Sequence, residues 1–424
     1  MEIILNPSKQ QWPALCKRAE TDDAVIESRV RDILSRVRTG GDAALAEITA
    51  QVEGRTAGSF LVSRREIAEA AGQVGAPLKE AIAAAAANIE AFHKAQKPQP
   101  VEVTTTEGVR CLRRQLPIDR VGLYIPGGSA PLFSTLLMLA IPAKIAGCRE
   151  VVLCTPAGRD GRVAPAVLYA ADFCGIDTIY SLGGAQAIAA MAYGTETIAP
   201  VSKIFGPGNR YVTKAKQMVS ALGVAIDMPA GPSEVMVMAD GTADVRFVAS
   251  DLLSQAEHGP DSQAMLLCLS REFAEAVASE TARQLALLPR RDIAAKALEN
   301  SRLIVLGSRE EAVAFANSYA SEHLIISMRD PWEIADRISA AGSVFIGNYS
   351  PESAGDYASG TNHTLPTMGL ARAWSGIGLD SFMHSVTYQQ LSREGLSLLG
   401  DTIVKMAEAE GLDAHAAAVK IRLQ

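Results

Sequence analysis

The sequence predicts an α/β fold with two parallel-sheet units, preceded by an N-terminal arm and followed by a C-terminal helical segment. Between residues 121 and 347, short β-rich runs alternate with helical runs, which implies parallel strands with helices on both faces of a sheet. A proline- and glycine-containing junction at 229–233 (PAGPS) divides this alternation into two units. With 424 residues, 48% of them hydrophobic, the chain can bury its cores without disulfides or structural metals.

The first 120 residues are predicted to form an arm followed by helices. Residues 1–20 are polar and resemble an arm more than a domain core. Apolar residues at helical spacing predict a helix over 24–37, closed by two glycines. Ser63 and Glu66 form a capping box ahead of a helical stretch that runs with interruptions to about residue 95. We expect these helices to pack onto the second α/β unit, with His93 at the surface.

The middle of the chain supplies the strands and helices of both units. The first unit contains VGLYI followed by a helix at 132–146, EVVLC and 163–173, TIYSL and 185–193, and KIFG and 209–221. The second contains EVMVMA and 244–257, AMLLCL and 271–287, RLIVL and 309–320, LIISM and 331–340, and SVFIG. A long polar segment without periodicity follows at 348–369, and such loops are usually functional or disordered. From about Asp380 the pattern is helical to the end.

Composition excludes several classes of function. The net charge of −7, without basic clusters, gives no electrostatic footprint for nucleic acid or for an anionic membrane. The longest apolar stretch, 132–143, is too short to span a bilayer, and the N-terminus lacks the pattern of a secretory signal. The six cysteines are scattered without a C-x-x-C pair, which indicates buried thiols in a reducing compartment. We therefore expect a cytoplasmic, multi-domain protein of the size of an enzyme, without nucleic-acid or membrane partners.

Two pairs of residues are candidate metal ligands. Gln255 and His258 share one face near the end of a predicted helix, which a Gly-Pro pair then stops. The pair is either a helix-terminal cap or part of a metal site. Asp356 and His363 lie in the polar segment, where Asp356 is a candidate oxygen ligand. An Asx-turn and a surface imidazole explain this second pair equally well.

Two further pairs contain histidine. Glu322 and His323 are adjacent at a helix-to-strand junction and could carry protons at different pKa values. Alternatively, His323 interacts with a helix dipole. His415 lies on the last helix after Glu410. An isolated histidine on a terminal helix is ordinarily a surface feature.

Glycine-rich loops follow predicted strands at 124–131, 182–186 and 206–209. Each places glycines before a helix N-terminus, where free backbone N–H groups attract phosphate. Loops at consecutive strand ends converge at one edge of a parallel sheet, where open α/β folds bind ligands. No G-x-G-x-x-G follows a predicted strand, and tight turns also explain these glycines. The pattern predicts binding of a nucleotide or another phosphate ligand.

Several segments closely resemble the histidinol dehydrogenase family: VGLYIPGGSAPLFST, GGAQAIAA, IFGPGN, DMPAGPSEV, DLLSQAEHGPDSQ, SEHLII and SPESAGDYASGTNH. The resemblance runs from about residue 23 to the C-terminus and implies two incomplete Rossmann-like domains. Residues 23–120 with 235–375 would form the domain that holds the metal and catalytic residues, and 121–234 the domain on the NAD side. Residues 1–22 would be the N-terminal arm, and 376–424 a C-terminal helical segment that contacts the partner subunit.

The resemblance also implies a reaction. It implies an NAD-dependent enzyme with one zinc ion per subunit that catalyses the final step of histidine biosynthesis. L-histidinol would be oxidised to L-histidine through bound L-histidinal, a four-electron oxidation that uses two NAD. His323 would take the alcohol proton, and Glu322 would activate the water that hydrates the aldehyde. The implied zinc ligands are Gln255, His258, Asp356 and His415.

The family is a homodimer whose C-terminal segment reaches into the neighbouring active site, which implies that Glu410 and His415 act in trans. NAD contacts map onto one residue in each glycine loop: Tyr124, Gln186 and Asn209. Substrate contacts map onto Ser233, Gln255, His258, His323, Asp356, His363, Glu410 and His415.

Three alternatives stay open at the level of the sequence. A related dehydrogenase acting on another polyol or amino alcohol would keep the scaffold. A zinc hydrolase would use Glu322 with metal-bound water and would not need nucleotide loops. A non-catalytic ligand-binding paralogue would be expected to have lost Glu322 or His323, and both are present.

Overall fold

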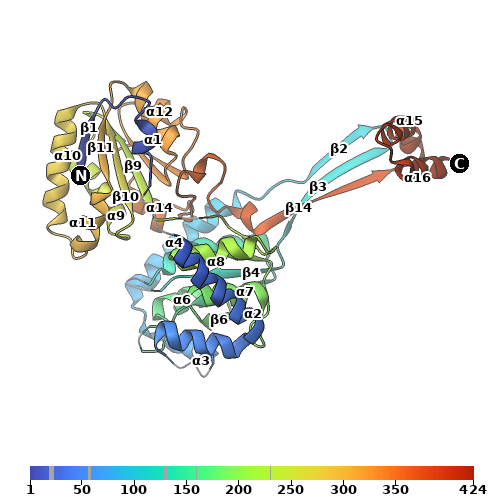
Figure 1. Ribbon diagram of the computed structural model, residues 1–424, viewed down its shortest axis with the longest axis horizontal. Helices are drawn as coiled ribbons and strands as arrows, with labels where there is room; N and C mark the ends of the chain where they lie inside the picture. The colour runs from blue at the N-terminus through green and yellow to red at the C-terminus, as the bar shows by residue number, and fades with distance from the viewer. Residues whose placement is uncertain (19–22, 56–58, 128–130, 159, 230) are drawn as a thin grey trace.

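The computed structural model describes residues 1–18, 23–55, 59–127, 131–158, 160–229 and 231–424. These residues form two α/β lobes and an extended arm that projects away from both (Figure 1). The predicted α/β class is confirmed: each lobe is built on a parallel sheet, and helices cover the sheets. Ala230 of the predicted junction and residues 128–130 of the first glycine loop lie outside the described residues.

The first lobe, called here the six-stranded lobe, has a parallel sheet in the order β1-β11-β10-β9-β12-β13. Side chains alternate between its faces, as the strand period requires. Val235 and Val237 pack under α9 and α10, whereas Met236 and Met238 pack under α12. Its elements are β1 (Glu2–Leu5), α1 (Trp12–Leu15), β9 (Glu234–Ala239), α9 (Val245–Ala256), β10 (Gln263–Cys268), α10 (Arg271–Leu285), α11 (Arg291–Glu299), β11 (Arg302–Val305), α12 (Arg309–Tyr319), β12 (His323–Ser327), α13 (Pro331–Ala335), β13 (Ser343–Ile346) and α14 (Glu352–Tyr357).

The second lobe, the five-stranded lobe, has a parallel sheet in the order β6-β5-β4-β7-β8. Helices α3 to α6 share a core on one face, and α2, α7 and α8 share the core on the other. Its elements are α2 (Asp23–Glu53), α3 (Arg64–Gln73), α4 (Ala76–Lys94), β4 (Arg120–Tyr124), α5 (Phe133–Ala146), β5 (Glu150–Thr155), α6 (Pro165–Phe173), β6 (Thr178–Ser181), α7 (Gly184–Tyr193), β7 (Lys203–Phe205), α8 (Arg210–Ser220) and β8 (Ala225–Ile226).

The helices between residues 23 and 94 therefore correct one expectation. We expected them to pack onto the second α/β unit and grouped 23–120 with 235–375, but α2, α3 and α4 pack on the five-stranded lobe. Their apolar faces, such as Val30, Leu34 and Val37 of α2, are buried there. Helical periodicity reveals that such a face exists but not which sheet covers it. The predicted break at the glycine pair is present as a kink at Gly41, where φ is +51°.

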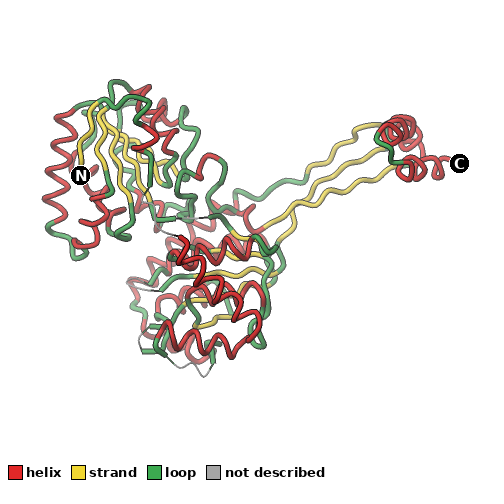
Figure 2. The backbone as a smooth tube through the Cα atoms, in the orientation of Figure 1, coloured by secondary structure: helices red, strands yellow, loops and turns green. Residues whose placement is uncertain are grey.

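The extended arm corrects a second expectation. Its antiparallel sheet, in the order β14-β3-β2, contains β2 (Val101–Thr106), β3 (Val109–Pro117) and β14 (Met383–Leu391). Residues 383–391 were predicted to be helical, but β14 pairs along its whole length with β3. That pairing joins segments far apart in the sequence, so no local pattern announces it. Helices α15 (Arg393–Ala409) and α16 (Asp413–Leu423) at the tip are as predicted, and Figure 2 shows the long strands leading to them.

The N-terminal residues correct a third expectation, because they belong to a domain core. The strand β1 pairs in parallel with β11. Trp12 is buried against Phe315, with ring centroids 5.2 Å apart, and its indole N–H donates to the carbonyl of Pro7. Residues 19–22 of the predicted arm lie outside the described part. The polar segment 348–369 is irregular as predicted apart from α14, and two short 3₁₀ turns follow it, η1 (Leu370–Arg372) and η2 (Leu379–Phe382). Among the described residues, no helix has the length and apolar character to cross a membrane.

Candidate active site

The candidate site lies at the amino edge of the six-stranded sheet. His323 is the first residue of β12, and Glu322 directly precedes it. The strand β9 lies beside β12 and begins at Glu234, directly after half-buried Ser233. The helix α9 runs back toward this edge and ends near Gln255 and His258. The chain topology thus gathers three of the predicted site segments at one place.

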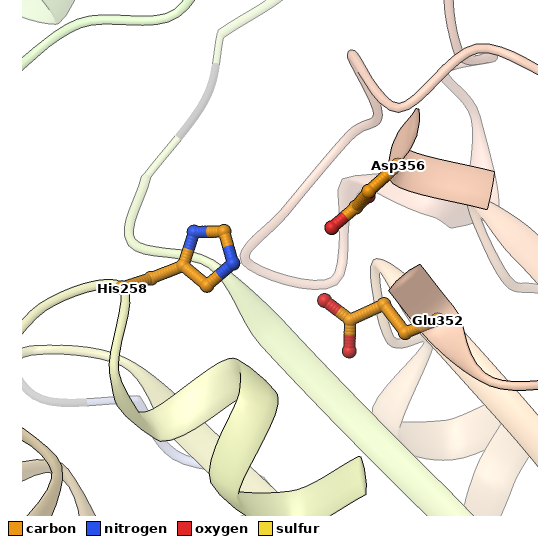
Figure 3. Close-up of side chains that lie close together, drawn as sticks. All are labelled: His258, Glu352 and Asp356. Atoms are coloured by element: carbon orange, nitrogen blue, oxygen red, sulfur yellow. The ribbon is translucent and has the colours of Figure 1, made fainter. Parts of the chain in front are cut away.

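Three side chains form a cluster with the geometry of a cation site (Figure 3). One candidate ligand atom from each of His258, Glu352 and Asp356 lies within 4.8 Å of the others. Glu352 and Asp356 are four residues apart on α14, so their carboxylates share one helix face. Figure 3 shows both carboxylates directed toward the imidazole of His258. Neutral imidazole and carboxylate oxygens are ligand types that zinc accepts.

Gln255 lies one helical turn before His258 and fits the same interpretation. Its side chain is fully buried, yet neither Oε1 nor Nε2 has a hydrogen-bond partner among the residues that the structure describes. Burying an amide without hydrogen bonds costs free energy, so a buried amide that lacks partners in the chain usually binds another group. A cation beside His258 and Asp356 would supply that partner to the amide oxygen. The residues present therefore fit a divalent cation.

Burial controls the ionisation of the carboxyl groups here. It raises the pKa of Asp356 to about 7, and it raises the pKa of Glu352 well above its usual range, with the charge of Asp356 adding to the effect. It raises the pKa of Asp251, on α9, to about 7 as well. Desolvation disfavours the charged form of each acid, and a nearby cation would reverse this.

His323 has the environment of a neutral base. Burial lowers the pKa of its imidazole to about 3. Its Nδ1 lies 3.2 Å from the carbonyl oxygen of Glu234, which can only accept, so Nδ1–H donates to it and Nε2 carries the lone pair. That Nε2 is buried, has no hydrogen-bond partner in the described part of the chain, and lies 3.7 Å from Oδ1 of Asp356. A free lone pair next to the candidate cation site is ready to accept a proton.

Glu322 is buried beside His323. Its Oε2 accepts a hydrogen bond from the backbone N–H of Glu234 at 2.8 Å and lies 3.7 Å from Nδ1 of His323. Burial raises the pKa of the Glu322 carboxyl well above its ordinary value. A carboxyl group with a raised pKa is a better general base than an exposed one once it has lost its proton.

His363 connects the two lobes. Its Nδ1–H donates to the backbone carbonyl of Asp356 at 2.8 Å, so its Nε2 accepts from the hydroxyl of Thr135 on α5 at 3.0 Å. Burial lowers the pKa of His363 to about 4, which keeps the ring neutral. Arg210 at the start of α8 also pairs with Asp261 beside β10, at 2.7 Å. The carboxyl edge of the five-stranded sheet therefore adjoins the amino edge of the six-stranded sheet.

The three glycine loops begin at that carboxyl edge, because their described residues follow the parallel strands β4, β6 and β7. The N–H of Gly184 donates to the hydroxyl of Tyr124 at 3.1 Å, and burial raises the pKa of that hydroxyl to about 12. Gly206 has a φ of +122°, and a Cβ there would lie 2.0 Å from the carbonyl oxygen of Tyr124. This contact requires glycine.

The candidate NAD residues Gln186 and Asn209 lie at helix starts. Asn209 caps α8 by accepting from the N–H groups of Tyr211 and Val212, and buried Gln186 donates to Glu53 at 3.4 Å. Each lies at the first turn of its helix, beside a glycine loop.

The structure does not bring every predicted residue together within one chain. Glu410, directly after α15, and His415, on α16, are exposed, and Figure 1 shows these two helices at the tip of the extended arm, far from α14. Two minor expectations were also wrong. His93 is fully buried, with Nδ1 2.8 Å from the carbonyl oxygen of Ile89, and His384 lies on a strand and not in a helix.

Sequence reasoning missed Glu352 and Glu234. Glu352 had a usable signal, since it stands four residues before Asp356, but we interpreted the surrounding segment as a loop. Glu234 had no such signal, because in the sequence it is only the polar first residue of an apolar strand.

The edge-to-edge arrangement of a glycine-loop sheet and a carboxylate–imidazole cluster defines an α/β enzyme with a site between its lobes. Comparison with known proteins gives the family. The profile of the histidinol dehydrogenase family matches residues 16–423. The chain belongs to this family and is an oxidoreductase that acts on a CH–OH group.

Individual relatives agree over the full length. The chain is 54% identical to the histidinol dehydrogenase of Bacteroides thetaiotaomicron, covering 100% of this chain and 99% of that one. The crystal structure of histidinol dehydrogenase from Elizabethkingia anophelis is 50% identical, with a TM-score of 0.97 over 100% of this chain and 98% of that chain. An acetylating aldehyde dehydrogenase from Geobacillus thermoglucosidasius shares only the fold, at 14% identity and a TM-score of 0.50 over 90% and 94% of the two chains.

Proposed function

We propose that this protein is a cytoplasmic, zinc-containing, NAD-dependent histidinol dehydrogenase that catalyses the last step of histidine biosynthesis. It oxidises L-histidinol to L-histidine through bound L-histidinal and consumes two NAD. The observation that carries the proposal is the cluster of His258, Glu352 and Asp356, with its ligand atoms within 4.8 Å, beside the unpaired lone pair of His323. The family supplies the reaction, and this geometry supplies groups suited to it. All six cysteines are free, in keeping with a reducing compartment.

Gln255, His258 and Asp356 of one subunit, with His415 of the other, would hold the zinc ion. The ion supplies positive charge that binds the imidazole and amine of the substrate and orients its carbinol. Unpaired Gln255 and the closeness of His258 to Asp356 support the three ligands from the body of the subunit. Glu352 lies beside them and would balance the charge of the ion.

His323 would take the hydroxyl proton as hydride leaves for the nicotinamide. Its Nδ1–H is committed to the carbonyl of Glu234, so only Nε2 can accept this proton. The imidazole is neutral at physiological pH because burial lowers its pKa to about 3. A base with so low a pKa would transfer the proton onward quickly, and the neighbouring carboxylates of Glu322 and Asp356 would stabilise the transient imidazolium.

Glu322 would activate water for hydration of the bound aldehyde, which must precede the second hydride transfer. Its Oε2 is held by the N–H of Glu234, which leaves Oε1 for the water. The two adjacent groups thus divide the proton transfers: imidazole for the alcohol and carboxyl for the water.

The extended arm supports a homodimer with a shared active site. Its helices expose large apolar side chains, including Leu398, Met406 and Ile421, which are 58%, 61% and 68% accessible in one chain. Exposed apolar surface of this kind marks an interface. Docked on a second subunit, the arm would bring Glu410 to the substrate's ammonium group and His415 to the zinc ion.

NAD would bind across the glycine loops near Tyr124, Gln186 and Asn209, facing the cluster. Substrate would contact Ser233, Gln255, His258, His323, Asp356 and His363 of one subunit, and Glu410 and His415 of the other.

The test is the stoichiometry of the reaction. Purified protein loaded with zinc is expected to reduce two NAD for each L-histidinol consumed and to release L-histidine. One NADH with free aldehyde would contradict the assignment of the hydration step. NAD reduction with other amino alcohols but not histidinol would favour a related dehydrogenase, and the absence of NAD binding would favour a hydrolase.

A further inference from the structure

The backbone N–H and carbonyl of Glu234 hold the two side chains assigned to proton transfer. Its N–H donates to Oε2 of Glu322 at 2.8 Å, and its carbonyl accepts from Nδ1 of His323 at 3.2 Å. These hydrogen bonds fix the orientation of the Glu322 carboxyl group and the tautomer of the His323 ring. A shift of this one residue would displace both groups together.

The side chain of Glu234 is itself held by two distant segments. Its carboxylate accepts two hydrogen bonds from Arg18, from Nε and Nη2, each at 2.9 Å. Its Oε1 also accepts from the backbone N–H of Met368, at the end of the loop that carries His363, at 2.8 Å. Glu234 is 1% exposed, so these bonds form away from water.

Arg18 is equally constrained. Its guanidinium lies over the ring of Tyr319, 3.7 Å from the centroid, and donates to the backbone carbonyls of Tyr319 and Cys16. A planar, bidentate pair of this kind fixes angles as well as distances, which a lysine would not do. The N-terminal segment thus reaches the site through a rigid chain of contacts.

We propose that Glu234, clamped by Arg18, is the positioning residue for both Glu322 and His323. The inference rests on the proposed roles of those two residues. A buried ion pair is weak evidence for stability, since an apolar pair of similar volume often serves as well. Here the pair joins Arg18 of the N-terminal segment to Glu234, whose backbone holds both groups. This place in the structure supports the positioning role.

The experiment measures kcat and KM of Glu234→Gln for L-histidinol and for L-histidinal, together with zinc content. The amide keeps the shape but loses the bidentate pair. We expect kcat to fall at least about tenfold with both substrates, because misplacement by a fraction of an ångström suffices. KM should stay within about threefold, and zinc content should not change. Loss in both half-reactions distinguishes this variant from Glu322→Gln, which should impair chiefly the aldehyde step.

Asp240→Asn is the matched control. Asp240 follows the other end of the same strand, and its carboxylate pairs with Arg309 at 3.2 Å and accepts from the N–H of Arg329. This variant should lose stability but keep kcat. Arg18→Lys should give a kcat between those of the wild type and Arg18→Met. If Arg18→Met does not fold, the kcat values of Arg18→Lys and Glu234→Gln test the positioning role.

Unchanged kcat in Glu234→Gln, or an equal loss in Asp240→Asn, would overturn the inference while the wild type still oxidises histidinol. A wild type that does not reduce NAD with histidinol would instead overturn the proposed function, and the positioning role with it.

Discussion

The Nε2 atom of His323 lies 3.7 Å from Oδ1 of Asp356, although the two residues come from a strand and from a helix more than thirty positions apart. This contact places the candidate base directly beside a candidate metal ligand. Proton transfer and substrate binding are therefore expected to respond to changes at either residue.

His323→Asn should abolish the first oxidation, because the amide cannot accept the hydroxyl proton. We expect a loss of about 10²–10⁴-fold in kcat with histidinol, the usual contribution of a general base. Glu322→Gln should retain the first NADH and lose chiefly the second. Single-turnover measurement of NADH separates the two steps. If both variants lose only the first step, the division of roles is wrong.

His258→Asn and Gln255→Ala should each lower zinc content measured by elemental analysis after dialysis. Each removes a donor from the cluster, and loss of a ligand weakens zinc binding. The exposed His384 on the extended arm supplies the matched control, His384→Asn, which should retain the wild-type stoichiometry. Unchanged zinc affinity in His258→Asn would remove that residue from the site.

Stability of the metal-free protein should depend on pH in a defined way. Asp251 and Asp356 have their pKa values raised to about 7, so each stabilises the fold in its protonated form and loses that contribution as pH rises toward 7. His323 and His363 have lowered pKa values of about 3 and about 4, so they favour the fold increasingly up to their unfolded value of 6.5. Above pH 6.5 the histidine contribution levels off, while the contribution of the carboxyl groups is still being lost.

The melting temperature of the metal-free protein should therefore fall between pH 6.5 and about pH 8, and added zinc should raise it more at the higher pH. Calorimetry of chelator-treated protein measures both effects. Asp356→Asn should weaken this dependence. A metal-free protein that gains stability over this range would contradict the raised pKa values.

Lys216 should matter for NAD binding through the third glycine loop. Its Nζ donates to the carbonyl of Gly206 and pairs with Asp227 at 2.5 Å, while Asp227 accepts from the N–H of Gly206 at 2.8 Å. Lys216→Met frees this loop and should raise the KM for NAD about tenfold, and the unpaired carboxylate should cost about 3–5 kcal/mol of stability. The control is Lys203→Met. The amine of Lys203 donates to the carbonyl of Ser381, so this variant should keep the wild-type KM for NAD.

A shared active site predicts complementation. When His258→Asn and His415→Asn subunits are mixed, half of the dimers are mixed, and each of these has one intact site. Activity should recover to about a quarter of the wild type, although each variant alone is inactive. If His415 acted within its own chain, every site would carry a defect and mixing would restore nothing.

Much of the fold was accessible from the sequence because it depends on local patterns. The apolar runs at 234–239 and 263–268 and the glycine loops mark parallel sheets and their edges, and both are found. Pairing across long distances was not accessible. Neither β14 with β3 nor β1 with β11 has a local signature, so one segment was predicted as helix and the other as an arm outside the domain core.

For the site, too, local patterns could be predicted from the sequence and long-range contacts could not. Gln255 and His258 could be paired from helical spacing, whereas their meeting with Asp356 required the resemblance to a family. Glu234 acts through its backbone, and Arg18 through a contact across 216 positions, so residue type gave no clue to either.

The anomalous scattering of a crystal grown with zinc, measured above and below the zinc absorption edge, tests the central claim most directly. We predict a peak within coordination distance of His258, Asp356 and the amide oxygen of Gln255, with His415 of the second subunit completing the site. A peak elsewhere, or none at this cluster in a protein that oxidises histidinol, would contradict the account.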